Sequence, residues 1–290
     1  MTPVRFAKMS GAGNDFILLD ARNGHATVPE PDRIRRWCTR RYAVGADGLI
    51  LLVSAEDGRL GMRYFNADGS EAAMCGNGGR CLARFAVLLG AAPEGEVLHL
   101  DAGGRSYRAR VEGGRVRMSW PEPTGLRRDV ALDLPGGARR TDVIDTGVPH
   151  AVFFTDDVEG EDVVGLGRAV RHHPAFAPEG VNVNFLQIDD PRHARIRTYE
   201  RGVEDETLAC GTGTVAAAIL ARRRGAVATS LAVTTRSGEV LEVVCEDSAE
   251  GTVRIEQRGS ARLVYWGEMS AEAEQFVPPG DRAEATRERR

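Results

Sequence analysis

The sequence predicts an α+β fold of two pseudo-symmetric domains, each a curved mixed β-sheet wrapped around a central helix, with the active site between them. Three observations predict it. A cysteine followed by a glycine-rich helix start occurs twice, strand-like apolar segments are numerous, and each half holds one long helical pattern. Strands and helices do not alternate regularly, which argues against a doubly wound parallel sheet.

The first helix start lies in the stretch from Asn66 to Gly90. Cys75 stands just before Gly76-Asn77-Gly78-Gly79, and apolar residues then recur at helical spacing until Gly90, a typical helix stop. We therefore expect Cys75 at a helix N-terminus. Unpaired backbone N–H groups and the helix dipole favour a thiolate or a bound carboxylate there, so at least one cysteine of the site should have a lowered pKa.

The same arrangement recurs at Cys210. This cysteine precedes Gly211-Thr212-Gly213, a second apolar helical pattern and Gly225. The spacing from the cysteine to the closing glycine is the same in both copies. The duplication predicts two like halves, each aiming one cysteine at a shared point.

In the first half, short strands are expected at residues 4–9, 16–20, 49–53 and 59–66, with an amphipathic helix at 31–41. After the long helix, strand patterns at 97–101, 106–112 and 115–120 close this half. Pro121-Glu122-Pro123 is the predicted linker, so the first domain should cover residues 1–120.

The second half, residues 121–263, opens with a polar stretch rich in glycine and arginine, for which no element is expected. A helix is predicted at 163–171 and the second long helix at 211–224. Residues 281–290 are highly charged and are expected to be disordered. Strands are predicted at 141–145, 151–154, 181–188, 194–199, 228–235, 240–246, 252–258 and 261–266.

Composition excludes several classes of protein. The chain has 290 residues, 42% of them hydrophobic, and a net charge of −4, which argues against a general nucleic-acid binder. No apolar run approaches the roughly 20 residues of a membrane span, and the N-terminus lacks the apolar core of a signal peptide. Five cysteines, an odd number, then indicate a reduced cytoplasmic protein.

The sequence also bears on cofactors. A pyridoxal phosphate enzyme needs a lysine for its Schiff base, and Lys8 is the only lysine of the chain. Nothing around Lys8 resembles a cofactor site. The gap from Cys75 to Cys81 is not a zinc-ligand spacing, and no histidine pair lies near it. We therefore predict neither pyridoxal phosphate nor a metal.

Two thiols that face each other across a cleft suit the inversion of a carbon acid. One thiolate removes a proton from one face of the carbon, and the opposite thiol delivers a proton to the other. The alternative for any cysteine is a small buried hydrophobe, which we favour for Cys38, Cys81 and Cys245 but not for the duplicated pair. The segment GTGTVA at 211–216 matches the loose dinucleotide-binding pattern, but no acidic residue follows at the required distance.

Several stretches, in this order, resemble the diaminopimelate epimerases, a family of cofactor-independent amino-acid racemases and epimerases. They are SGAGNDFILLD, GADGLILL, FNADGSEAAMCGNGGRC, TGVPHAV, GVNVNF and YERGVEDETLACGTGTVAAA, between residues 10 and 218. Proline racemases share the paired cysteines but resemble this chain less in the flanking segments. The resemblance implies a final strand near residues 264–268 that returns to the first domain (residues 264–280), and a homodimer.

The resemblance also implies roles for single residues. Cys75 and Cys210 would be the acid and base, and His150 would support the site. Arg201 can bind a distal carboxylate in a fork, while Glu200 and asparagine oxygens can take the distal ammonium. The implied substrate contacts are Asn14, Asn66, Gly76, Asn77, Asn182, Glu200, Arg201, Gly211 and Thr212, of which Gly76, Asn77, Gly211 and Thr212 would bind the reacting carboxylate through backbone N–H groups.

Other interpretations of these residues stay open. Asn14 and Asn66 could be turn residues, Glu200–Arg201 a solvated surface pair, and His150 a packed core histidine. Two positions also depart from the family pattern. Val148 stands where many members have asparagine, and Gly48 where some have glutamine, so a side-chain contact there should be absent or replaced by backbone or water.

The function that the sequence predicts is the interconversion of LL- and meso-2,6-diaminopimelate by two-base proton transfer, for lysine and peptidoglycan-precursor synthesis, without a cofactor. The alternative is a racemase for another amino acid, such as proline or hydroxyproline. A non-catalytic binding protein of the same fold is the rival from another class.

Overall fold

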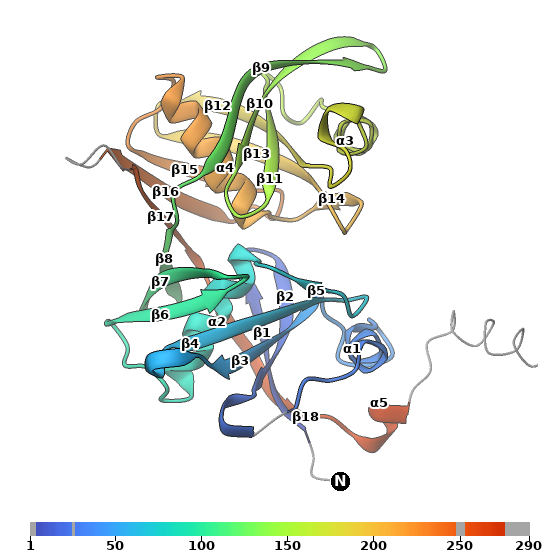
Figure 1. Ribbon diagram of the computed structural model, residues 1–290, viewed down its shortest axis with the longest axis vertical. Helices are drawn as coiled ribbons and strands as arrows, with labels where there is room; N and C mark the ends of the chain where they lie inside the picture. Colours follow the sequence, from blue (N-terminus) through green and yellow to red (C-terminus); the bar gives the residue numbers. More distant parts are fainter. Residues whose placement is uncertain (1–3, 25–26, 248–252, 276–290) are drawn as a thin grey trace, which may run out of the picture.

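The structure, a computed structural model, describes residues 4–24, 27–247 and 253–275 in two lobes (Figure 1). The predicted disorder of residues 281–290 lies outside the described residues. The first lobe holds the helices α1 (Pro31–Cys38), α2 (Gly76–Leu88) and α5 (Ala271–Gln275). Its strands are β1 (Arg5–Gly11), β2 (Asn14–Asp20), β3 (Gly48–Ser54), β4 (Leu60–Asn66), β5 (Glu71–Ala72), β6 (Val97–Ala102), β7 (Arg105–Glu112), β8 (Arg115–Trp120) and β18 (Arg262–Glu268).

The second lobe holds α3 (Val163–Arg171) and α4 (Gly211–Arg223). In both lobes a mixed sheet lies around the long helix, α2 or α4, which confirms the predicted α+β class (Figure 1). The strands of the second lobe are β9 (Thr124–Leu134), β10 (Gly137–Asp145), β11 (Pro149–Phe154), β12 (Asn182–Asp190), β13 (His193–Glu200), β14 (Asp205–Thr207), β15 (Ser230–Thr234), β16 (Val240–Asp247) and β17 (Val253–Ser260).

The two lobes repeat one topology. In the first, β2 and β3 are parallel, β4 is antiparallel to β3, and α2 leads to β6, which is parallel to β4. In the second, β11 and β12 are parallel, β13 is antiparallel to β12, and α4 leads to β15, which is parallel to β13. The helices α1 and α3 occupy equivalent places. The duplication seen around the cysteines therefore extends to whole lobes.

The lobes also exchange a strand. The antiparallel pair of β8 and β17 joins them, and each of these strands is followed by a strand that pairs in the other lobe. β9 pairs with β10, and β18 returns to pair with β1. The division into a first domain of residues 1–120 with 264–280 and a second domain of residues 121–263 stays a prediction. In the strand pairings the chain returns from the second lobe to the first slightly earlier, at Ala261.

The long helices are enclosed because their sequences are apolar on nearly every face. In α4 every residue from Gly211 to Ala221 is buried, and in α2 Cys81, Leu82 and Phe85 are buried in the same continuous core. Smaller cores lie under α3 and α1. A helix buried this way has its N-terminus held firmly, which fixes the residue that caps it.

The structure corrects two expectations. β9 was not predicted, because most of its side chains are exposed and it therefore lacks the alternation of buried residues that marks a strand. The first helix ends at Cys38 rather than at residue 41. Thr39 already has extended backbone angles (φ −67°, ψ 113°), and its hydroxyl bonds back to the carbonyl of Arg35.

The contact between α3 and β13 yields a stability prediction. A Cβ added at Gly167 would lie 2.4 Å from Cβ of Tyr199, a fully buried residue. Gly167→Ala gains about 1 kcal/mol of helix propensity. Overpacking of a rigid contact costs more, toward the upper end of about 1–3 kcal/mol. We expect a lower free energy of unfolding in urea, whereas Val164→Ala, on the exposed side of α3, should change little. Equal stability of Gly167→Ala and wild type would contradict this packing.

Candidate active site

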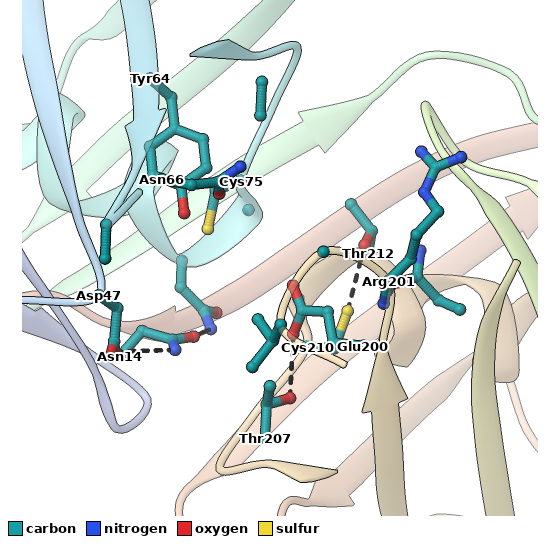
Figure 2. Close-up of a pocket in the computed structure, with 18 of the residues that line it drawn as sticks. Asn14, Asp47, Tyr64, Asn66, Cys75, Glu200, Arg201, Thr207, Cys210 and Thr212 are labelled. Atoms are coloured by element: carbon teal, nitrogen blue, oxygen red, sulfur yellow. Dashed lines mark hydrogen bonds between the residues drawn. The ribbon is translucent and has the colours of Figure 1, made fainter. Parts of the chain in front are cut away.

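A cavity of about 1050 Å³ opens between the lobes and holds both duplicated cysteines. Its walls come from both halves, and Figure 2 shows Cys75 and Cys210 on opposite sides of it. Eleven of the site residues predicted from the sequence line this cavity; His150 does not. The eleven are Cys75, Cys210, Asn14, Asn66, Gly76, Asn77, Asn182, Glu200, Arg201, Gly211 and Thr212.

Each cysteine occupies the N-cap of its long helix, with an extended backbone (φ −130°, ψ 118° at Cys75; φ −112°, ψ 109° at Cys210). The two helix N-termini meet head to head. A Cβ added at Gly76 would lie 3.4 Å from Cα of Gly211, and one added at Gly211 would lie 3.2 Å from Cα of Gly76. Glycine at both places therefore lets the two N-termini converge on one point.

The geometry of this junction suits an anion. Both N-termini direct unpaired N–H groups and the positive end of a helix dipole to the same region. The side chain of Asn77 is already engaged, since its Nδ2 donates to Asn14 Oδ1 (2.5 Å) and to the carbonyl of Ala209 (3.0 Å). Its side-chain donor is therefore not free to face a ligand, and the role predicted for its backbone N–H stays a prediction.

The expectation of a lowered cysteine pKa is wrong. Burial raises the pKa of Cys75 to about 12 and that of Cys210 well above its ordinary value, and the charge of Glu200 adds to both shifts. Backbone N–H groups of Asn77 and Gly78 oppose the shift at Cys75, but desolvation outweighs them. Burial at this site therefore favours the neutral thiol form of both cysteines.

Glu200 lies next to this pair, and its own pKa is shifted. Its carboxylate accepts a hydrogen bond from the hydroxyl of Thr207 (2.9 Å). Burial raises its pKa to about 7, with a further contribution from the charge of Asp47. Figure 2 shows that the Glu200 side chain enters the cavity near Cys210, whereas Arg201 extends in a different direction.

Arg201 and Asn182 form the wall beyond Glu200. Asn182 accepts from the backbone N–H of Arg201 (2.9 Å), which fixes the end of β13. The guanidinium of Arg201 donates to the carbonyl of Glu179 (3.3 Å). No carboxylate lies within ion-pair distance of it in the part of the chain that the structure describes. Val148 adds an apolar surface to the cavity wall.

The opposite wall carries Asn14, Asn66 and a residue that the sequence analysis did not identify, Tyr64. Asn14 Nδ2 donates to Asp47 (3.1 Å), and Asn66 Nδ2 donates to Ser70 (3.1 Å). A Cβ added at Gly48 would lie 2.7 Å from ring carbon Cε2 of Tyr64 and 3.2 Å from its hydroxyl. The nearest atom is the backbone carbonyl oxygen of Phe65 (2.4 Å), so backbone and the Tyr64 ring together fill the space next to Gly48.

His150 lies behind the cavity wall, and its supporting role stays a prediction. It pairs with Asn182 across β11 and β12 and is completely buried. Burial lowers its pKa to about 3, so the ring is neutral. Its Nδ1 lies 3.1 Å from Nδ2 of Asn184 and accepts that hydrogen bond. Asn184 was missed as a separate residue, although it stands in the GVNVNF stretch.

Lys8 takes no part in the cavity. It is buried in β1, where its ammonium lies 2.7 Å from Asp15 and donates to the carbonyl of Gly45.

In the described residues no helix is long and apolar enough to cross a membrane.

The raised pKa of Glu200 predicts a pH-dependent stability. Its pKa is about 7 in the folded protein and about 4.5 when unperturbed, so the folded state keeps a proton that the unfolded chain loses. The free energy of unfolding should therefore fall as pH rises from 4.5 through 7. We expect a smaller decrease between pH 5 and pH 8 for Glu200→Gln than for wild type or for the exposed variant Glu96→Gln, measured by urea denaturation. An unchanged pH dependence in Glu200→Gln would contradict the assignment.

Comparison of the fold identifies solved structures with the same architecture. The fold matches a probable proline racemase from Agrobacterium radiobacter (TM-score 0.74, 16% identity, 96% of this chain and 97% of that one). It also matches a hydroxyproline epimerase from Agrobacterium vitis (TM-score 0.71, 16% identity, 95% and 96%). At this identity the likeness shows the shared fold alone.

Sequence comparison is more specific. A diaminopimelate epimerase from Chlorobaculum tepidum is 45% identical over 264 residues, which cover 90% of this chain and 100% of the relative. One from Aquifex aeolicus is 38% identical over 94% of this chain and 100% of the relative. The family model for diaminopimelate epimerase matches residues 6–124 and 143–264. The chain therefore belongs to the diaminopimelate epimerase family.

Proposed function

We propose that this protein interconverts LL- and meso-2,6-diaminopimelate, with Cys75 and Cys210 as the two acid–base groups. The observation that carries the proposal is the pair of thiols on opposite sides of one cavity. Each thiol lies at the N-terminus of a long helix, and both helices begin at the same anion-binding junction. A carbon held between the thiols can lose a proton to one side and gain a proton from the other.

The α-carbon is a weak acid, and the junction between the two helix N-termini stabilises the anion that forms when its proton is removed. The substrate's α-carboxylate would lie against the N–H groups of Gly76, Asn77, Gly211 and Thr212. As the proton leaves, negative charge spreads into this carboxylate, and the fixed N–H groups and helix dipoles stabilise that charge without rearrangement. This chemistry requires neither a metal nor pyridoxal phosphate.

Glu200 couples substrate binding to thiolate formation. Its charge is the largest electrostatic cause that raises the pKa of both cysteines. Because its carboxylate lies beside Cys210, we place it against the ammonium of the reacting carbon rather than the distal ammonium expected from the sequence. A bound ammonium offsets the charge of Glu200, so the pKa of the neighbouring thiols falls once the substrate is in place.

Arg201 favours diaminopimelate over a substrate with one carboxylate. Arg201 lines the cavity, no protein carboxylate pairs with its guanidinium in the described chain, and Asn182 fixes the backbone next to it. A distal carboxylate would supply that partner. Asn14 and Asn66 then remain on the opposite wall for the amino groups. A proline racemase would leave this end of the cavity unused.

The assay that tests the function compares two substrates. Purified protein without added cofactor or metal should convert LL-diaminopimelate to the meso form and leave L-proline unchanged, as resolved by chiral chromatography. Racemisation of proline or hydroxyproline in place of diaminopimelate would establish the alternative. Binding of diaminopimelate without any change in stereochemistry would establish a binding protein.

We further propose a cytoplasmic homodimer that acts on a small-molecule substrate. The support is a group of exposed apolar side chains on β18: Val264, Tyr265 and Trp266 are 56%, 43% and 50% exposed. Exposed apolar side chains gathered on one strand are typical of a region that another chain covers. Sedimentation of Tyr265→Glu against wild type tests this; identical sedimentation of both as monomers would contradict it.

The first functional prediction concerns the cysteines. Cys75→Ala and Cys210→Ala should each lower kcat by several orders of magnitude, because inversion needs a group on each face of the carbon. Cys38→Ala and Cys245→Ala, which remove buried thiols that cap neither long helix, should keep kcat and lose only some stability, although Cys38 borders the cavity. Steady-state kinetics on the four variants decides. Substantial turnover by either cavity variant would rule out the two-base mechanism.

The second concerns the distal carboxylate. Arg201→Met should raise KM by roughly 10- to 100-fold, because a charge-assisted hydrogen bond contributes about 1.5–3 kcal/mol. Arg192→Met, which changes an exposed arginine in the turn between β12 and β13, serves as the matched control and should leave KM unchanged. If both variants had wild-type kinetics, the proposed place of the distal carboxylate would be wrong.

A further inference from the structure

Arg80 is a buried cation directly behind the anion-binding junction. It lies in the first turns of α2 and is 0% exposed. Its guanidinium packs on the backbone of β17, where a Cβ added at Gly259 would lie 2.8 Å from Nε and 2.9 Å from Cζ. Glycine at this position therefore makes the space that the guanidinium occupies.

All the hydrogen-bond acceptors of Arg80 are neutral. Its Nη1 donates to Gln257 Oε1 and its Nη2 to Asn77 Oδ1, both at 2.6 Å. Nε donates to the carbonyl of Ser260 (3.3 Å), and Nη1 also lies 3.5 Å from the carbonyl of Gly76. Within the described residues no carboxylate is close enough to form an ion pair with this side chain.

The surrounding charges do not compensate Arg80. The groups that act on it are Cys81, Cys75, Glu239 and Arg115, and Glu239 is already paired with Arg262 (2.8 Å). Burial lowers the pKa of Arg80 only to about 10, so it stays charged at neutral pH. A buried charge without a counter-charge lowers stability, and proteins that keep one commonly use it.

The partners of Arg80 tie it to both helix N-termini. Gln257, also fully buried, donates from Nε2 to the carbonyl of Gly211 (2.8 Å) and to the hydroxyl of Thr214 (2.7 Å). Asn77 donates to the carbonyl of Ala209, the residue before Cys210. One buried chain of hydrogen bonds therefore runs from α2 through β17 to the first turn of α4, with a single full charge in it.

We propose that Arg80 is a positioning residue that supplies the fixed positive charge of the junction between α2 and α4, and that the neutral side chain of Gln257 leaves this charge uncompensated. The proposal rests on the proposed function. Two anions can supply the missing counter-charge: the thiolate, which forms at this junction, and the substrate carboxylate, which binds there. Arg80 acts through Asn77 and the field it sets across the first turns of both helices, without touching the substrate.

The charge can be separated from the geometry at Gln257. Gln257→Met and Gln257→Glu both lose the donors to Gly211 and Thr214, but only the glutamate places an anion on Arg80. The readout is the rate of alkylation of Cys75 by iodoacetamide at pH 9, assigned by tandem mass spectrometry, which is proportional to the thiolate fraction. It requires no turnover, so it stays informative if the proposed reaction is wrong.

We expect Arg80→Met and Gln257→Glu to slow alkylation by about tenfold, the effect of one unit of pKa. Arg80→Lys should restore most of the rate. Gln257→Met, and Arg84→Met one turn further along α2, should alkylate at the wild-type rate. In the turnover assay Arg80→Met should lower kcat on the order of 100-fold, with a smaller change in KM, as for loss of a preorganised electrostatic group.

Two results would overturn the proposal. One is wild-type alkylation in both Arg80→Met and Gln257→Glu. The other is equal slowing in Gln257→Met and Gln257→Glu, which would make the hydrogen-bond geometry, not the charge, the active element. Near-UV circular dichroism selects the variants that keep the native fold. If Arg80→Met does not fold, the two Gln257 variants alone decide.

Discussion

The head-to-head contact of two helix N-termini is the constraint on which the rest of the structure depends. The close approach of α2 and α4 is helped by Gly76 and Gly211, which carry no side chain at the point where the two helices meet. The duplicated lobes, the β8–β17 pair that joins them and the continuous core around both helices all hold this contact in place. The exchange of β9 and β18 between lobes closes the arrangement, so neither helix can move far without disturbing the partner lobe.

Two opposing electrostatic effects meet at this contact. Helix dipoles, N–H groups and the guanidinium of Arg80 favour an anion, whereas burial and the charge of Glu200 disfavour a thiolate. At both cysteines the second effect is the larger, so the pKa is raised and the thiol form is favoured. A zwitterionic substrate reverses the balance, since its ammonium offsets Glu200 and its carboxylate occupies the junction. The site is therefore set to become reactive when the correct ligand is bound.

Sequence patterns predicted the local features well. The repeated Cys-Gly-x-Gly starts located α2 and α4, and the motif residues Asn14, Asn66, Asn182, Glu200 and Arg201 all line one cavity. Features that depend on distant contacts were missed. Tyr64 next to Gly48, the exposed strand β9, and the bond from Arg80 to Gln257, 177 residues away, leave no local pattern. The sign of the cysteine pKa shifts was wrong because a sequence shows helix starts but not the depth of burial.

The most direct measurement of the central claim, that two thiols act on opposite faces of one carbon, is the early fate of solvent deuterium. LL-diaminopimelate is incubated with the enzyme in deuterated water, and substrate and product are separated before the reaction approaches equilibrium. Two facing thiols predict meso product with deuterium at the inverted carbon and recovered LL substrate without it, because the proton removed and the proton delivered belong to different groups. Deuterium in the recovered substrate at the same rate as in the product, or product that retains the original hydrogen, would show a single base and contradict the account.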